Sequence, residues 1–210
     1  MALTTVIPSY RYFIVVATGF IASALAYSSL PRPYQVWVAL TLPITAALIH
    51  VLLRIVWSRD PVRDGDDTFA PTYDAIIFAV GVFIIAIHLM VIAALVGALP
   101  AAPTSLTRGT IVIFGLLIVR IGNLLPRTRP NLAFGIRTTR TLADRRFWMQ
   151  MHRMAGYVAV GFGVVLVVSG AFLSRPRMDT VLGTAVLVAA AVLAVSYARY
   201  AGASSASSAA

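Results

Sequence analysis

The chain alternates between long apolar stretches and short polar connectors. A helix that crosses a bilayer needs about 20 predominantly apolar residues, and six stretches reach or approach that length. Prolines stand in the connectors, where they end helices. Because lipid offers no hydrogen-bond partners to an open backbone, this pattern predicts an all-α transmembrane bundle of six helices. The predicted spans are residues 12–30, 36–57, 75–99, 106–125, 157–173 and 181–200.

These spans form one predicted membrane domain over residues 1–201. Residues 1–107 carry the first three spans, and residues 108–201 carry the others apart from the first two residues of the fourth. A polar block separates the fourth span from the fifth. We call residues 122–156 the arginine-rich block. Residues 202–210 contain only Gly, Ala and Ser and are predicted to be a disordered tail.

The first span has an alternative interpretation. Arg11, the apolar run 13–22 and the small residues of Ala24-Leu25-Ala26 together resemble a signal peptide with its cleavage site. Cleavage there would leave five spans. Against this, the other five spans already insert the chain, and small residues are common in membrane helices.

The composition supports a membrane protein and removes several kinds of chemistry. The chain is 60% hydrophobic and 11% charged, which a soluble domain of 210 residues could not hide from water. It has no cysteine, so disulfides, thiolate nucleophiles and cysteine metal sites are excluded. The net charge of +10 lies beside apolar spans, where anionic headgroups attract arginine. The lipid bilayer is therefore the expected partner, and direct nucleic-acid binding is not.

Arginine is distributed unevenly between the two sides of the predicted bundle. Arginine-rich short loops stay in the cytoplasm, so we expect both termini and the arginine-rich block to be cytoplasmic. The opposite side holds Arg32, Arg108, Arg175 and Arg177. The predicted cytoplasmic side holds Arg11, Arg54, Arg59, Arg63, Arg120, Arg127, Arg129, Arg137, Arg140, Arg145, Arg146, Arg153 and Arg199.

The arginine-rich block has the pattern of a structured loop followed by a helix. Asn131 and Gly135 favour tight or left-handed backbone turns. Thr141 can cap a short helix, with Asp144 three residues later as in a capping box. Apolar and charged residues divide into two faces over 142–154, which predicts a short amphipathic helix along the cytoplasmic interface.

Two interpretations of this block remain open. It is either a basic anchor that only fixes topology, or a functional surface. Directional hydrogen-bonding groups, which an anchor does not need, favour a functional surface. These groups are Asn123, Asn131, Thr138, Thr141 and His152.

The block also resembles the signature of the SdpI family of bacterial membrane proteins. The resemblance rests on Gly122-Asn123, Pro126, Asn131, Gly135-Ile136-Arg137-Thr138, Thr141-Leu142, Trp148, His152-Arg153 and Gly156. The chain departs from the usual pattern at Arg140, where the family commonly has an aromatic residue, and at Met151, where it often has Thr.

The resemblance implies a polytopic protein of a bacterial inner membrane that is linked to immunity against a secreted peptide toxin. The member that gives the family its name is also linked to holding a cytoplasmic repressor at the membrane. The resemblance therefore implies a role in signalling as well. The partners expected from it are a cytoplasmic regulator or an extracellular peptide toxin. The predicted functional surface comprises Asn123, Asn131, Gly135, Arg137, Thr138, Trp148, His152 and Arg153.

Several polar residues fall inside the predicted spans near the cytoplasmic side. His50 and Arg54 are four residues apart and share one helix face. Asp74 begins the third span on the same side, and Arg120 could either snorkel or pair with it. Together with Asn123 and His152, these groups could form a polar vestibule, or each could be solvated separately.

His88 lies midway along the third span, where an ionisable group suggests function. A neutral histidine bonded to a neighbouring helix is the favoured interpretation. Axial haem ligation by His50 and His88 is a weaker alternative, because their depths differ by roughly 9 Å at 1.5 Å per residue.

No pattern in the chain predicts an enzyme, a cofactor or a metal site. It has no HExxH, phosphate loop or nucleophile–base pair. The Asp-rich connector over residues 59–74 lacks calcium-loop spacing and is predicted to be solvated. Two other roles stay open, an accessory or scaffold subunit of a membrane complex and a carrier with a pathway lined by His88. Ala155, Ala159 and Gly163 recur every four residues, which predicts close helix packing.

Overall fold

The computed structural model describes residues 10–62 and 67–207. In these residues six helices are long and apolar enough to cross a membrane, which confirms the predicted six-span bundle. A seventh, shorter helix lies between the fourth and fifth spans. The helices are α1 (Tyr10–Ala26), α2 (Gln35–Ser58), α3 (Ala70–Leu95), α4 (Pro103–Leu124), α5 (Thr139–Ala143), α6 (Arg145–Phe172) and α7 (Arg175–Ser207), with 3-10 turns η1 (Tyr27–Ser29) and η2 (Leu125–Arg127).

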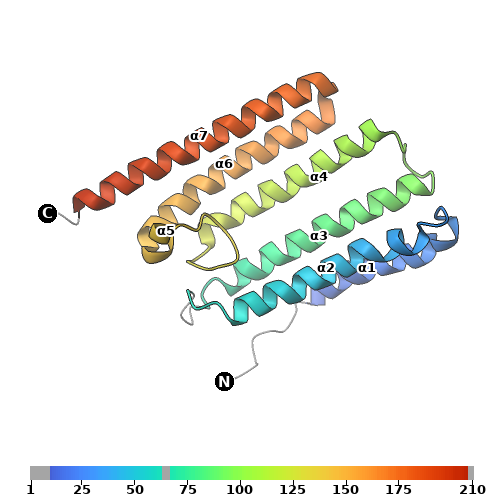
Figure 1. Cartoon of the computed structure of the whole chain (residues 1–210), viewed down its shortest axis with the longest axis horizontal. Helices are drawn as coiled ribbons and strands as arrows, with labels where there is room; N and C mark the ends of the chain where they lie inside the picture. The colour runs from blue at the N-terminus through green and yellow to red at the C-terminus, as the bar shows by residue number, and fades with distance from the viewer. Residues whose placement is uncertain (1–9, 63–66, 208–210) are drawn as a thin grey trace.

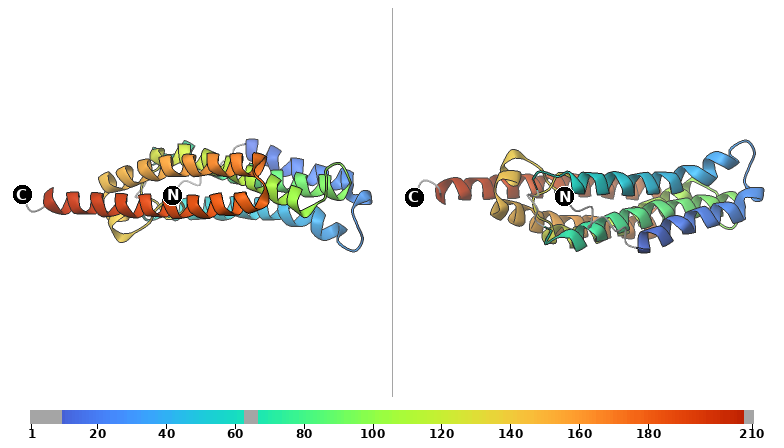
Figure 2. Two further views of the ribbon diagram at one scale, coloured as in Figure 1. Left: turned by 90° about the horizontal axis from the view of Figure 1, so that it is seen from above. Right: turned by 90° about the horizontal axis from the view of Figure 1, so that it is seen from below.

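The spans form a flat array. Figure 1 shows α7, α6, α4 and α3 side by side, with α2 and α1 packed at one edge, and Figure 2 shows that the array is thin. Helices α1, α2 and α3 contact one another and form one half of the molecule. In the other half α4 packs on α6, and α6 packs on α7. Helices α3 and α4 join the halves.

Buried hydrogen bonds and aromatic rings hold the first half together. The Tyr12 hydroxyl of α1 donates to the Ala46 carbonyl of α2 at 2.6 Å. Between α2 and α3, the Trp57 ring packs against Phe69 and Tyr73, with ring centroids 4.9 Å and 4.5 Å apart. This cluster lies at the end of the bundle that carries the arginine-rich block, which we call the block end.

Glycine lets α4 and α6 approach until their backbones touch. A Cβ atom added at Gly122 would lie 2.9 Å from the Gly156 carbonyl oxygen, and one at Gly115 would lie 2.8 Å from the Gly163 oxygen. Ala159 belongs to the same contact, 3.0 Å from the Gly122 Cβ position. The predicted small-residue packing is therefore confirmed, and its partner is α4 of the same chain.

Two local predictions for the block are wrong. The predicted interfacial helix over 142–154 is instead split, because Asp144 adopts extended backbone between α5 and α6. Its carboxylate accepts from the backbone N–H groups of Arg146 and Phe147, so Asp144 caps α6. The cap of α5 is Thr138 rather than Thr141, which occupies the third helical position of the capping box. The apolar side of 145–154 therefore packs inside the protein, as the first turns of a span.

The far C-terminal segment also differs from its composition-based prediction. Helix α7 continues to Ser207, inside the 202–210 stretch that was predicted to be disordered, and residues 208–210 lie outside the described residues.

Candidate functional site

The loop that follows η2 is shaped by one buried amide. Asn131 is fully buried, and its Oδ1 accepts from the backbone N–H groups of Ala133 and Phe134 at 2.9 and 2.8 Å. Its Nδ2 donates to the Arg129 carbonyl at 2.7 Å. Asn131 therefore satisfies backbone groups that a tight turn leaves unpaired. It builds the loop from inside and offers no free group to a partner.

Gly135 and His152 fix the next part of the loop. The backbone N–H of Ile136 donates to His152 Nε2 at 3.0 Å, and His152 Nδ1 lies 2.9 Å from the Trp148 carbonyl. Since a carbonyl only accepts, Nδ1 carries the proton and His152 is neutral in this arrangement. Gly135 has φ +109°, and a Cβ atom there would lie 2.0 Å from His152 Nε2. Only glycine fits this close approach.

Trp148 completes the buried part of the site. Its ring is parallel to that of His152, with centroids 3.8 Å apart, and neither side chain is exposed. The Trp148 indole N–H donates to Thr128 Oγ1 at 3.2 Å, and the Thr128 hydroxyl donates to the Leu125 carbonyl at 2.8 Å. The start of α6 is thus bonded to the end of α4 through the loop.

Threonine and tyrosine side chains connect the loop to α5 and α7. The Thr141 hydroxyl donates to the Ile136 carbonyl at 2.8 Å and accepts from the Thr138 N–H at 2.8 Å. Tyr197 of α7 donates to Thr138 Oγ1 at 3.3 Å. Arg140 lies over the Phe147 ring, 5.3 Å from its centroid, and donates to the Ala201 carbonyl. The block therefore contacts every helix of the second half.

Asp60 connects the block to the first half of the molecule. Its Oδ2 accepts from the Leu132 N–H at 2.7 Å and its Oδ1 from the Val62 N–H at 2.9 Å. Nearby, the Phe134 ring packs on Tyr73 with centroids 4.9 Å apart. Asp60 is buried, so the prediction of a solvated Asp-rich connector is wrong at this position. Asp64 and Asp66 of that connector lie outside the described residues.

Sequence reasoning did not assign Asp60 to the site. The signal that could have found it is the order Asp60-Pro61-Val62, because an aspartate followed two residues later by a free N–H forms a turn of its own. Its second bond joins residues 72 positions apart, which no local pattern shows.

Replacing Asp60 by Ala is expected to loosen the loop from the first half. The substitution leaves two backbone N–H groups without their acceptor, which costs about 1–3 kcal/mol when such groups are buried. Amide hydrogen exchange at Leu132 should then become much faster than in the unmodified protein. Asp179→Ala, at an exposed position of α7, is the matched control and should leave Leu132 protected. Unchanged exchange at Leu132 in the Asp60 variant would contradict the link.

The structure divides the predicted functional surface into two groups. Asn131, Trp148 and His152 are buried, and Thr138 is half-buried, so they support the surface instead of forming it. The other residues of the predicted surface, Asn123, Gly135, Arg137 and Arg153, are exposed. Arg137 follows directly on the loop segment held by His152.

Of the alternatives left open for the polar groups within the spans, the structure shows neither the shared vestibule nor an Arg120–Asp74 pair. Arg54 of α2 pairs with Asp74 of α3 at 2.6 Å, and Arg120 is exposed on α4. His50 stacks on Tyr12 with centroids 3.9 Å apart, and its ring nitrogens have no hydrogen-bond partner among the described residues.

His88 is bonded to a neighbouring helix, as the favoured interpretation predicts. Its Nε2 lies 2.8 Å from Ser23 Oγ of α1, and Ser23 also donates to the Ala39 carbonyl of α2 at 2.7 Å. His50 contacts Tyr12, eleven residues before Ser23 on the same helix, so the two histidines differ in depth by about 16 Å at 1.5 Å per residue. They do not form the axial pair considered from the sequence.

Together, six membrane-spanning helices and a block bonded to both halves define a polytopic α-helical membrane protein. Residues 127–198 match the SdpI/YfhL protein family, which confirms the resemblance found in the sequence. The chain is an integral membrane protein whose residues 127–198 are similar to the SdpI/YfhL family. The matched region contains the loop, α5 and most of α6 and α7, and it begins after Asn123. Comparisons with curated proteins and with solved structures gave no match.

Proposed function

We propose that this protein acts by binding, without catalysis, and that the arginine-rich block is its docking surface for a cytoplasmic regulator. The observation that carries the proposal is the fixed presentation of Arg137. This residue is exposed on a loop segment whose neighbours Ile136 and Thr138 are each held by hydrogen bonds to buried side chains. A guanidinium carried by a backbone segment that is held in this way offers a fork of donors to a carboxylate or carbonyl partner.

The internal order of the block favours a docking surface over a topology anchor. An anchor requires positive charge near the end of a span, and any arginine in a solvated loop would supply it. Here a buried asparagine, histidine and tryptophan fix the loop by directional bonds. Such bonds hold a surface in one shape, which an electrostatic anchor does not need.

The proposal also includes the orientation of the bundle in the membrane. The block and the C-terminal end of α7 lie at one end of the bundle, as Tyr197 and Arg140 show by contact. The excess of arginine at that end supports a cytoplasmic orientation of this end in a bacterial cell. Immunity against a secreted peptide toxin would then follow from the family resemblance, with the regulator reporting the toxin's presence.

Arg137→Ala is expected to abolish partner binding while leaving membrane insertion intact. The side chain is exposed, so its removal leaves the buried bonds of the loop in place. A photo-reactive residue at exposed Thr139, close to Arg137, should capture a regulator from native membranes, and Arg137→Ala should abolish this capture. Trp148 is unsuitable for the probe because it is buried.

Arg146→Ala is the matched control, because Arg146 is an exposed arginine of the same block. It removes the same charge and should leave capture unchanged. Equal loss in both variants would show that only net charge matters, which is the anchor interpretation. Capture of a soluble protein supports the proposal.

One observation favours a scaffold role as the second candidate. Helix α7 packs mainly on α6, and most of its surface is exposed. Its apolar side could therefore pack against a helix of another subunit as well as against lipid. Capture of integral membrane subunits by a probe at exposed Leu187 would support this role.

A further inference from the structure

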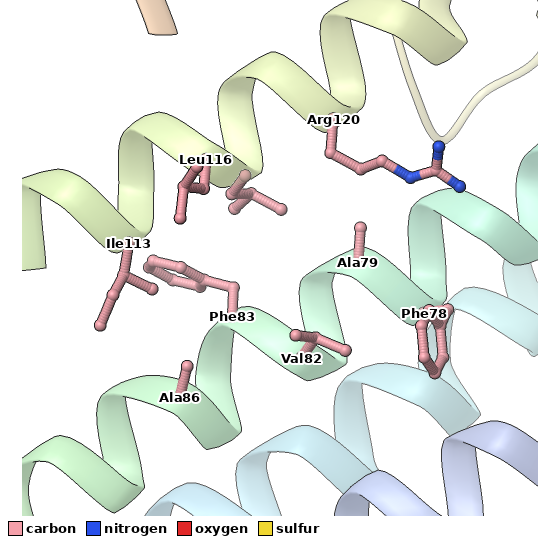
Figure 3. Close-up of a pocket in the computed structure, with 9 residues that line it drawn as sticks. Phe78, Ala79, Val82, Phe83, Ala86, Ile113, Leu116 and Arg120 are labelled. Atoms are coloured by element: carbon pink, nitrogen blue, oxygen red, sulfur yellow. The ribbon is translucent and has the colours of Figure 1, made fainter. Parts of the chain in front are cut away.

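A groove lies between α3 and α4, where the two halves of the molecule meet. It has a volume of about 350 Å³, and its lining is apolar apart from one residue. Figure 3 shows Ala86 and Ile113 at one end of it and Arg120 at the other. The lining residues are Phe78, Ala79, Val82, Phe83, Ala86, Ile113, Leu116, Leu117 and Arg120.

The single charge in this groove has no protein partner. Arg120 is exposed on α4 and makes no hydrogen bond or ion pair with any described residue. Asp74, considered from the sequence as one possible partner for Arg120, is paired with Arg54. An unpaired guanidinium beside the hydrocarbon is costly, so a partner from outside the protein would stabilise it.

The position of Arg120 along α4 identifies where that partner lies. Arg120 is four residues before Leu124, the last residue of α4, which places it about 6 Å from the helix end at 1.5 Å per residue. A long arginine side chain reaches from this depth to the level of the lipid headgroups. Asn123 is exposed one turn further toward the end of the same helix face, where its amide adds further hydrogen-bonding groups.

We propose that this groove binds one molecule of anionic phospholipid, with an acyl chain along the apolar lining of α3 and α4 and the phosphate on Arg120. The arrangement of the groove matches such a lipid, because its apolar lining runs along the spans and its one positive group lies near the ends of the spans. Basic sites between transmembrane helices bind anionic headgroups in this way. The guanidinium forms paired hydrogen bonds to phosphate oxygens.

The proposed lipid would touch both halves of the molecule. Phe78 and Phe83 belong to α3, whereas Ile113 and Leu116 belong to α4, so an acyl chain between them adds contacts across the joint. The site uses neither Arg137 nor the loop, and it stands independently of the proposed docking function.

The test uses the full chain purified in mild detergent. Native mass spectrometry counts the lipids bound when phosphatidylglycerol or phosphatidylcholine with the same acyl chains is added. We expect about tenfold tighter binding of phosphatidylglycerol, and we expect Arg120→Gln to abolish this preference. Arg146→Gln removes an exposed arginine of the block and should keep the preference. Ala86→Leu fills the apolar end and should weaken phosphatidylglycerol binding while Arg120 is intact.

Three outcomes would overturn the proposal. The first is equal binding of the two lipids by the unmodified protein. The second is an Arg120→Gln variant that retains the preference for phosphatidylglycerol. The third is displacement of the lipid by an equal concentration of inorganic phosphate, which would indicate an anion site without a role for the acyl chain.

Discussion

Replacing Gly135 by alanine is expected to disrupt the loop of the arginine-rich block. A Cβ atom at this position lies 2.0 Å from His152 Nε2, far inside contact distance. The loop must move, and the Ile136 to His152 hydrogen bond breaks. Positive φ adds about 1–2 kcal/mol for a residue other than glycine, and overpacking adds roughly 1–3 kcal/mol. We expect both faster amide exchange over the loop and loss of partner capture.

Gly97 provides the matched control for this substitution. It also has positive φ, at +80°, but a Cβ atom added there meets nothing within 4 Å. Gly97→Ala should therefore show the backbone cost alone and leave the block intact. The difference between the two variants in amide exchange and in partner capture measures the effect of the contact with His152. Equal effects would mean that backbone conformation, and not the histidine, selects glycine at position 135.

Replacing Gly163 by alanine is expected to separate α4 from α6. The new Cβ would lie 2.7 Å from the Gly115 carbonyl oxygen and 2.8 Å from the Val119 backbone nitrogen. Backbone atoms cannot rotate away as side chains can, so the helices must shift. Overpacking of this kind costs roughly 1–3 kcal/mol, and the apparent Tm in detergent should fall by several degrees.

Gly161 is the control on the same helix. A Cβ atom there meets nothing within 4 Å, and alanine is favoured over glycine inside a helix by about 1 kcal/mol. Gly161→Ala should leave the apparent Tm unchanged or raise it. A similar fall in both variants would show that helix flexibility, and not close approach, explains the glycine at 163.

Sequence reasoning failed where partners are distant. It left open whether Arg120 snorkels or pairs with Asp74, which lies near the same membrane face, and it did not find that Arg54 pairs with that carboxylate. Depth along a span can be counted from the sequence, whereas the rotation of a helix toward its neighbours cannot. For the same reason, the buried amide of Asn131 was grouped with exposed residues of the block.

The sequence by itself determined the six spans, their connectors, the family resemblance and the position of the block. Apolar length and proline placement are local properties, and a bilayer leaves few other ways to satisfy the backbone. The tertiary structure alone decided which block residues are exposed, that Asp60 bonds to Leu132, and that a groove ends at Arg120. These features depend on groups brought together from separate helices, and hydrogen bonds across 72 residues leave no periodic trace in the chain.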